Sequence, residues 1–248
     1  MKINVLFLIV ALIIPAREYA QTPVNKSITV QPGQKIAMRF DYPNLIRVST
    51  WDKNEISIQG SASINSGEND DAFKLETSTE GNTISIRNEI VNMKGIPHRF
   101  TIYDGAQKII FKSQEEMHKY QNEKGHGKFD RMTSGIDMDI YLDIKVPRNM
   151  DTRIESVYGI VEIKTFTGPL TVSSTYGAVD AALTESTTGE LIAETNYGDI
   201  YTNLNIKFGG EPSRQEDFHT YVSAKPGNGP RYSFESKYGN VYLRKATQ

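Results

Sequence analysis

The chain contains no cysteine among its 248 residues. It therefore has no disulfide, no thiolate nucleophile or thiolate metal ligand, and no cysteine that could carry a lipid anchor. An exported chain without disulfides is more typical of a bacterial envelope than of a eukaryotic secretory route. Strand ladders and core burial must stabilise its folded state.

The chain also lacks a strong excess of either charge, because it contains 28 Lys and Arg and 30 Asp and Glu, for a net charge of −2. The sequence shows no basic footprint of the kind that binds nucleic acid or an anionic membrane, so we expect no nucleic-acid partner. The length predicts one or two domains with a sizeable core.

Long apolar runs are missing outside the N-terminus. A basic start is followed by an apolar run over 5–15 and then by Ala16–Ala20. This order predicts a secretory signal peptide over 1–20, cleaved after Ala20. The apolar run is about half of the roughly 20 residues that span a bilayer. We expect an exported protein, in the periplasm or on the surface of a Gram-negative-type bacterium, with no integral membrane segment after signal removal.

Signatures of common catalytic and cofactor sites are absent as well. The sequence has no Gly-x-Ser-x-Gly elbow, no phosphate-binding loop and no dinucleotide fingerprint. We therefore expect no cofactor, and the chain is predicted not to be an enzyme.

What the sequence does contain is a recurring Tyr-Gly dipeptide, at spacings of 18, 21 and 41 residues, the last of which is close to two periods. Spaced recurrence of this kind indicates a structural repeat. The repeat residues are Tyr158, Gly159, Tyr176, Gly177, Tyr197, Gly198, Tyr238 and Gly239.

Each copy shares a pattern around its Tyr. The residue four positions before is apolar, the residue two before is small and hydroxylated, and the residue three after is β-branched. These sets are Ile154, Val172, Ala193 and Phe234; Ser156, Ser174, Thr195 and Ser236; and Val161, Val179, Ile200 and Val241. The alternation predicts two short strands per copy. The alternation of apolar and polar positions shifts by one residue at the Gly. A straight strand would then turn its apolar side chains to the wrong face, so we expect the chain to turn a corner there.

A unit of about 20 residues cannot bury its apolar face alone, so copies must stack. The predicted fold is all-β, a single-stranded β-solenoid, or β-helix, with Val161, Val179 and Ile200 in one column. The alternation places the Tyr side chains inward, as a packed corner ladder. The other interpretation is an exposed aromatic strip that stacks on sugar rings.

The predicted organisation is a signal peptide over 1–20, a β-strand region over 21–146 and the repeat over 147–248, continuous with that region. Residues 91–132 interrupt the strand pattern as a polar insertion, a solvated loop or a flap over one face, with one short helix over 113–123. A metal or binding loop is a further interpretation, although no ligand spacing with known mechanics is present. Its candidate residues are His98, Asp104, His118 and His126.

A gap in the repeat lies between Leu204 and Tyr232, where a copy lacks its Tyr-Gly. The segment predicts one degenerate coil with a surface excursion, in which 218–223 alternates like a strand. Polar residues gather there as a candidate surface site: Arg214, Asp217, His219 and Arg231.

Two segments resemble a known family. Asn44–Ile58, NLIRVSTWDKNEISI, and Leu142–Arg148, LDIKVPR, followed by the Gly-centred repeats, are similar to a bacterial family of exported, adhesin-like proteins that is uncharacterised. The resemblance implies a fold of β-strand repeats, defines no activity and assigns no catalytic residue. Members usually carry a small residue before the repeat Gly, where this chain has Tyr.

The resulting hypothesis is an exported, non-enzymatic adhesin-like or scaffold protein of the bacterial cell envelope, which binds a protein or a glycan. Self-association through an open end of the stack is a further possibility. The alternative is a carbohydrate-active enzyme, a polysaccharide lyase or hydrolase, on the same scaffold, since a glycosidase needs two nearby carboxylates. Candidate rows are Glu155, Ser173, Glu194 and Glu235, and Glu162 with Asp180.

Overall fold

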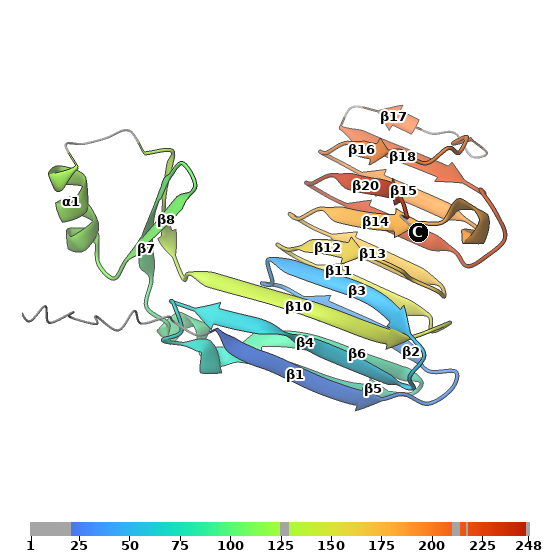
Figure 1. Cartoon of the computed structure of the whole chain (residues 1–248), viewed down its shortest axis with the longest axis horizontal. Coiled ribbons are helices and arrows are strands. Elements are labelled where there is room, and N and C mark those ends of the chain that lie inside the picture. The colour runs from blue at the N-terminus through green and yellow to red at the C-terminus, as the bar shows by residue number, and fades with distance from the viewer. Residues whose placement is uncertain (1–20, 125–128, 210–213, 217, 247–248) are drawn as a thin grey trace, which may run out of the picture.

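The computed structural model describes residues 21–124, 129–209, 214–216 and 218–246 (Figure 1), so the predicted signal peptide lies outside the described residues. The all-β prediction is confirmed, because two large sheets and one small sheet make up most of this part of the chain. The part of the chain that the structure describes has no helix with the length and apolarity to span a bilayer.

The first large sheet, sheet A, has eight strands. In spatial order they are β1 (Thr22–Thr29), β4 (Glu55–Ile64), β10 (Met138–Pro147), β3 (Leu45–Trp51), β12 (Ile160–Ile163), β14 (Val179–Leu183), β20 (Val241–Lys245) and β16 (Ile200–Thr202). The strands from β10 to β16 are parallel, whereas β1, β4 and β10 pair antiparallel.

The second large sheet, sheet B, has nine strands. In spatial order they are β17 (Arg214–Glu216), β18 (His219–Ala224), β15 (Leu191–Thr195), β19 (Tyr232–Ser236), β13 (Leu170–Ser174), β11 (Thr152–Ser156), β2 (Lys35–Phe40), β6 (Thr83–Ile90) and β5 (Phe73–Glu80). It is parallel from β15 to β6 and antiparallel at both ends. Both large sheets are thus mixed multi-strand sheets, and the chain as a whole is not the continuous single-stranded solenoid that the repeat predicts.

The last two strands of the chain lie inside the sheets. β19 lies between β13 and β15, and β20 lies between β14 and β16 (Figure 1). Val161, Val179 and Ile200 do share one column, as predicted, but Val241 separates the second from the third. The order of the copies in space is therefore not their order in the sequence.

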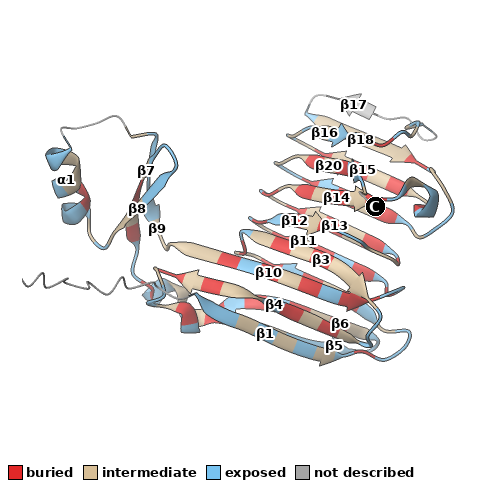
Figure 2. Cartoon of the chain, viewed as in Figure 1, coloured by how far each residue is buried: buried red, intermediate tan, exposed pale blue. Residues whose placement is uncertain are grey.

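The core lies between the two large sheets, and along most of their strands buried residues alternate with more exposed ones (Figure 2). In sheet B one column contains Met38, Ile154, Val172, Phe234 and Ala193, and all five are buried. A fully buried aliphatic side chain contributes about 1.5–3 kcal/mol relative to its exposed state. Because the side chains of a column pack on one another, the burial of each one requires the strands on both sides.

The segment predicted to be a degenerate coil is instead an antiparallel hairpin. β18 pairs with β15, and β17 pairs with β18, so the hairpin covers one end of sheet B. The strand predicted over 218–223 is confirmed as β18, whereas the prediction of a coil was wrong because this segment never crosses to sheet A. Covering an open sheet end in this way satisfies backbone groups that would otherwise be unpaired.

The predicted insertion is a small folded unit and not a solvated loop. β7 (Arg99–Asp104) pairs antiparallel with β8 (Gln107–Phe111) and with β9 (Arg131–Gly135). The predicted helix is confirmed as α1 (Gln114–Glu123), with the Ser113 Oγ accepting a hydrogen bond from the Glu116 N–H. Three short 3₁₀ turns complete the described elements: η1 (Asp70–Ala72), η2 (Met93–Gly95) and η3 (Glu185–Thr187).

Candidate functional site

Each Tyr-Gly copy is a corner between a strand of sheet B and a strand of sheet A. The last residue of the first strand is a buried Ser or Thr, and its hydroxyl accepts a hydrogen bond from the N–H of the Gly three residues later. The four N···O distances are 3.2 Å at Ser156, 3.1 Å at Ser174, 3.1 Å at Thr195 and 3.0 Å at Ser236. The small hydroxyl residue thus closes the corner.

The same hydroxyls connect neighbouring corners. The Ser236 Oγ donates to the Gly177 carbonyl at 2.8 Å, and the Thr195 Oγ1 donates to the Gly239 carbonyl at 2.9 Å. A Cβ atom at Gly177 would lie 2.0 Å from the Gly159 carbonyl oxygen. Glycine is required here because the next corner approaches too closely for a side chain, not because of a left-handed backbone.

The corner turns the Tyr side chains outward, so the expectation that they point inward was wrong. Tyr158, Tyr176, Tyr197 and Tyr238 are 59%, 56%, 60% and 44% exposed. Counting inward and outward positions assumes an extended strand, and that count fails once the chain bends between the buried Ser and the Gly. The second interpretation, an exposed aromatic strip, describes the geometry.

The exposed rings form one continuous stack, called here the aromatic ladder. Its rings in spatial order are Tyr42, Tyr158, Tyr176, Tyr238, Tyr197 and Phe218, with centroids 6.3, 5.3, 5.1, 5.1 and 5.8 Å apart. Successive planes differ by 30° or less, so the rings are stacked face to face. Such a row of exposed rings is a candidate interaction surface.

The repeat pattern missed both end rings, Tyr42 and Phe218, because neither belongs to a Tyr-Gly pair. Tyr42 is equivalent to Tyr158 in the structure, since Phe40 pairs with Ser156 and each Tyr follows two residues later, but this pairing cannot be read from the sequence. Phe218 has a left-handed backbone, with φ of 65°. A bulky side chain in that region is strained, and the sequence gives no signal of it.

Inner and end rings of the ladder differ in what they expose. Each inner ring has a ring neighbour on both faces and presents its edge and its hydroxyl to solvent. Within the described residues, Tyr42 has a ring neighbour on one side only, and unlike the inner rings it is half-buried against the core.

A cleft of about 730 Å³ opens beside the Tyr42 end of the aromatic ladder, and we call it the foot cleft. Tyr42 and Tyr158 line it from the large sheets, and the small sheet forms its other wall. Residues of that second wall and of the segment that joins it to β10 include Thr101, Tyr103, Lys108, Thr133, Ser134, Asp137 and Asp139.

One ion-pair cluster fixes the wall of the foot cleft. The Lys108 Nζ lies 2.6 Å from the Asp137 Oδ1 and 3.0 Å from the Asp139 Oδ2. Burial lowers the pKa of Lys108, but the hydrogen bonds from its ammonium group to both carboxylates outweigh that effect and leave the pKa raised. The cluster joins β8 to the start of β10 and so fixes the small sheet against sheet A.

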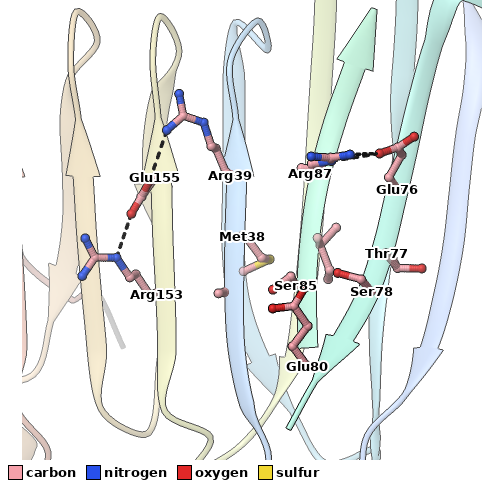
Figure 3. Close-up of a pocket in the computed structure, with 12 residues that line it drawn as sticks. Met38, Arg39, Glu76, Thr77, Ser78, Glu80, Ser85, Arg87, Arg153 and Glu155 are labelled. Carbon is pink, nitrogen blue, oxygen red and sulfur yellow. Dashed lines mark hydrogen bonds and ion pairs between the residues drawn. The ribbon is translucent and has the colours of Figure 1, made fainter. Parts of the chain in front are cut away.

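A second pocket, of about 470 Å³, lies on the outer face of sheet B (Figure 3). Arg87 pairs with Glu76 at 2.6 Å, while Glu155 accepts hydrogen bonds from Arg39 at 3.5 Å and from Arg153 at 2.8 Å. The hydrogen bond from Arg87 lowers the pKa of Glu76. Glu76 therefore favours its ionised form and is a poor proton donor.

The candidate catalytic rows lie on separate sheets. Glu155, Ser173, Glu235 and Glu194 are cross-strand neighbours on sheet B in that order, and Glu194 also lies 2.9 Å from the His219 Nε2. Glu162 neighbours Asp180 on sheet A. Burial raises the pKa of Glu162, but hydrogen bonds from Lys164 and Arg47 leave its pKa below the ordinary value.

The candidate metal loop is not assembled in the described structure. His98 lines the foot cleft, His118 lies on α1, Asp104 ends β7, and His126 lies outside the described residues. No group of three or more His, Asp or Glu suited to a metal ion occurs within the described ranges. In the repeat gap, His219 pairs with Glu194 and Arg231 pairs with Glu190 at 3.3 Å, so these two residues are not gathered into one site, and Asp217 is outside the described residues.

Comparison with known proteins gives weak similarities. No family model matches the chain, and no curated protein matches it. A solved structure from Clostridium sporogenes ATCC 15579, provisionally named a cell adhesion protein, is 10% identical with a TM-score of 0.47, over 90% of this chain and 100% of its own. Another from Bacteroides fragilis NCTC 9343, provisionally named an adhesin, is 9% identical with a TM-score of 0.22, over 91% and 98%. At these values neither similarity establishes a family, an activity or a partner.

Proposed function

We propose that the chain is an exported, non-enzymatic adhesin-like or scaffold protein of the bacterial cell envelope, which binds a glycan or a protein along its aromatic ladder. In this proposal the parallel middle of the two large sheets acts as a rigid β-solenoid. The observation that carries the proposal is the row of six stacked rings, of which four tyrosines are 44–60% exposed.

Exposed aromatic rings are costly to leave in water, and contiguous ones mark interaction sites. The corner chemistry supports the same role, because paired hydroxyls and close-packed glycines fix the backbone under each ring. A surface that is rigid before binding loses little conformational entropy on binding.

The alternative is a carbohydrate-active enzyme, and one observation favours it. Glu235 and Glu194 are direct cross-strand neighbours, and parallel strands lie roughly 4.8 Å apart, close to the separation of paired carboxylates in retaining glycosidases. Against the other candidate row, the pKa of Glu162 is lowered, whereas a general acid needs a raised pKa.

One experiment separates the two functions. Purified chain 21–248 is applied to a glycan array, and every bound glycan is then incubated with the protein and assayed for new reducing ends. The proposal expects binding without release, and binding that falls at least about tenfold when Tyr176 and Tyr238 are both replaced by Ser.

Matched controls make the result specific. The Tyr201→Ser variant removes an exposed ring that stacks on Tyr242 outside the ladder, at 5.3 Å, and should bind as the unmodified chain does. Release of reducing ends that is lost in Glu194→Gln or Glu235→Gln would establish the enzyme instead. An array without any bound glycan would restrict the ladder to protein partners.

A further inference from the structure

The foot cleft begins where the aromatic ladder stops. Tyr158 covers one face of Tyr42 at 6.3 Å, and within the described residues no ring covers the other. Tyr42 is half-buried against the core, and it lines the cleft together with Met93 and Met138. A planar group that enters the cleft can pack against the part of the Tyr42 ring that faces it.

The rim of this position is polar. The Asn44 Oδ1 accepts the Ile140 N–H at 2.8 Å, which directs the amide NH₂ group away from the backbone. Lys108 uses two of its three N–H donors on Asp137 and Asp139. Asp139 is 36% exposed and keeps carboxylate lone pairs for a ligand, and Thr133 and Ser134 line the same space.

One apolar ring face with donors and acceptors around its edge matches the two surfaces of a pyranose. The C–H bonds of a sugar ring pack on an aromatic face, and its hydroxyls pair with carboxylate, ammonium and amide groups at the rim. The cleft volume of about 730 Å³ falls within the range of small-ligand sites.

The charge of the cleft selects among sugars. The ion-pair cluster holds one ammonium and two carboxylates, so its net charge is −1, from +1 − 2. An acidic sugar would bring a further negative charge against Asp139 and would be disfavoured.

We propose that the foot cleft is a binding pocket for one neutral pyranose residue, which packs its C–H face against the Tyr42 ring where this ring lines the cleft and hydrogen-bonds to Asp139 and Lys108. This inference rests on the proposed function, because it gives the ligand class at one end of the ladder. The inner rings contact the rest of the partner by their edges and hydroxyls.

The test titrates chain 21–248 with methyl β-glycosides of neutral hexoses and of an N-acetylhexosamine, with methyl β-glucuronide as the acidic probe, and follows binding by ligand-observed NMR. A neutral glycoside should bind, the glucuronide should bind at least about tenfold more weakly, and Tyr42→Ala should weaken the neutral ligand by about tenfold. Tyr42→Phe keeps the ring and should retain binding, and Tyr201→Ala should have no effect.

The outcomes separate this pocket from the wider function. The pocket is wrong if no neutral glycoside binds, if Tyr42→Ala binds as tightly as the unmodified chain while circular dichroism shows both folded, or if only aromatic peptides compete. Should array glycans then still depend on Tyr176 and Tyr238, the proposed function stands without the pocket. Should the neutral glycoside bind and depend on Tyr42 while the ladder variants retain all array binding, the pocket stands and the ladder proposal fails.

Discussion

At the scale of single residues, the corner depends on two small side chains for different reasons. The Ser or Thr hydroxyl pairs with backbone groups that would otherwise be buried without partners, and the Gly leaves room for the carbonyl oxygen of the next corner. The backbone path is thereby fixed at the four Tyr-Gly rings of the aromatic ladder.

Replacing Gly177 by Ala should destabilise the protein by at least about 2 kcal/mol, because the new Cβ would lie 2.0 Å from the Gly159 carbonyl oxygen and both corners must shift. Urea unfolding followed by circular dichroism measures the change. Gly135→Ala is the matched control, since a Cβ there meets nothing within 4 Å, and it should stay within about 0.5 kcal/mol of the unmodified chain. Equal effects of the two substitutions would contradict the close-approach argument.

The repeat pattern in the sequence predicted which residues pair between strands, but it did not predict the direction of the Tyr side chains. The pairing of Val161 with Val179 follows from a shared pattern, because like positions align when copies stack. The direction of the Tyr side chains could not be read, because it depends on a bend that the two-residue period does not describe. Tyr42 and Phe218 join the ladder by spatial position alone.

At the scale of elements, charge rows accompany the strand pairing on the outer faces. Arg47 on β3 donates to Glu162 on β12 at 2.8 Å, and Arg244 on β20 donates to Asp180 on β14 at 2.7 Å. Each pair connects neighbouring strands across a sheet that backbone hydrogen bonds already join. The hydrogen bond from Arg47 also helps to lower the pKa of Glu162, which makes this carboxyl a poorer acid.

Glu162 should make the stability of the protein pH-dependent. Its lowered folded-state pKa means that it stabilises the fold above the unfolded-state pKa of about 4.3 and that this contribution is lost as the pH falls through the folded-state value. Glu162→Gln should lower the free energy of unfolding by about 0.5–1 kcal/mol at pH 7, and the difference should shrink toward pH 3.

Urea titrations at pH 7, 5 and 3 test this expectation. The exposed Glu115 on α1 provides the control, because Glu115→Gln should follow the unmodified chain at each pH. A Glu162→Gln variant whose deficit grows on acidification would show that the sign of the pKa shift is wrong.

At the scale of the whole molecule, the order of the strands within each sheet could not be predicted from the sequence. The four copies share one pattern, so nothing within a copy says which of the others lies beside it. The small sheet was also missed, because its polar composition favours a loop even though β7 alternates between buried and less buried residues. The all-β class was predictable because alternation recurs along nearly the whole chain.

Removing the last two strands should affect more than the end of the molecule. A chain ending at residue 230 lacks β19 and β20, so β13 and β15 lose their shared neighbour, as do β14 and β16. We expect loss of cooperative thermal unfolding and fast hydrogen exchange in β15 and β18. A chain ending at residue 245 keeps both strands and should unfold as the full chain does; protected amides in β15 of the shorter chain would contradict the strand order.

The late position of β19 and β20 in the sequence also constrains how the protein matures. Synthesis delivers the N-terminus first, so β15 and β16 exist for a time without the strands that separate them from β13 and β14. Their final partners arrive only with residues 232–245. A nascent chain therefore cannot complete either large sheet until its very last segment emerges.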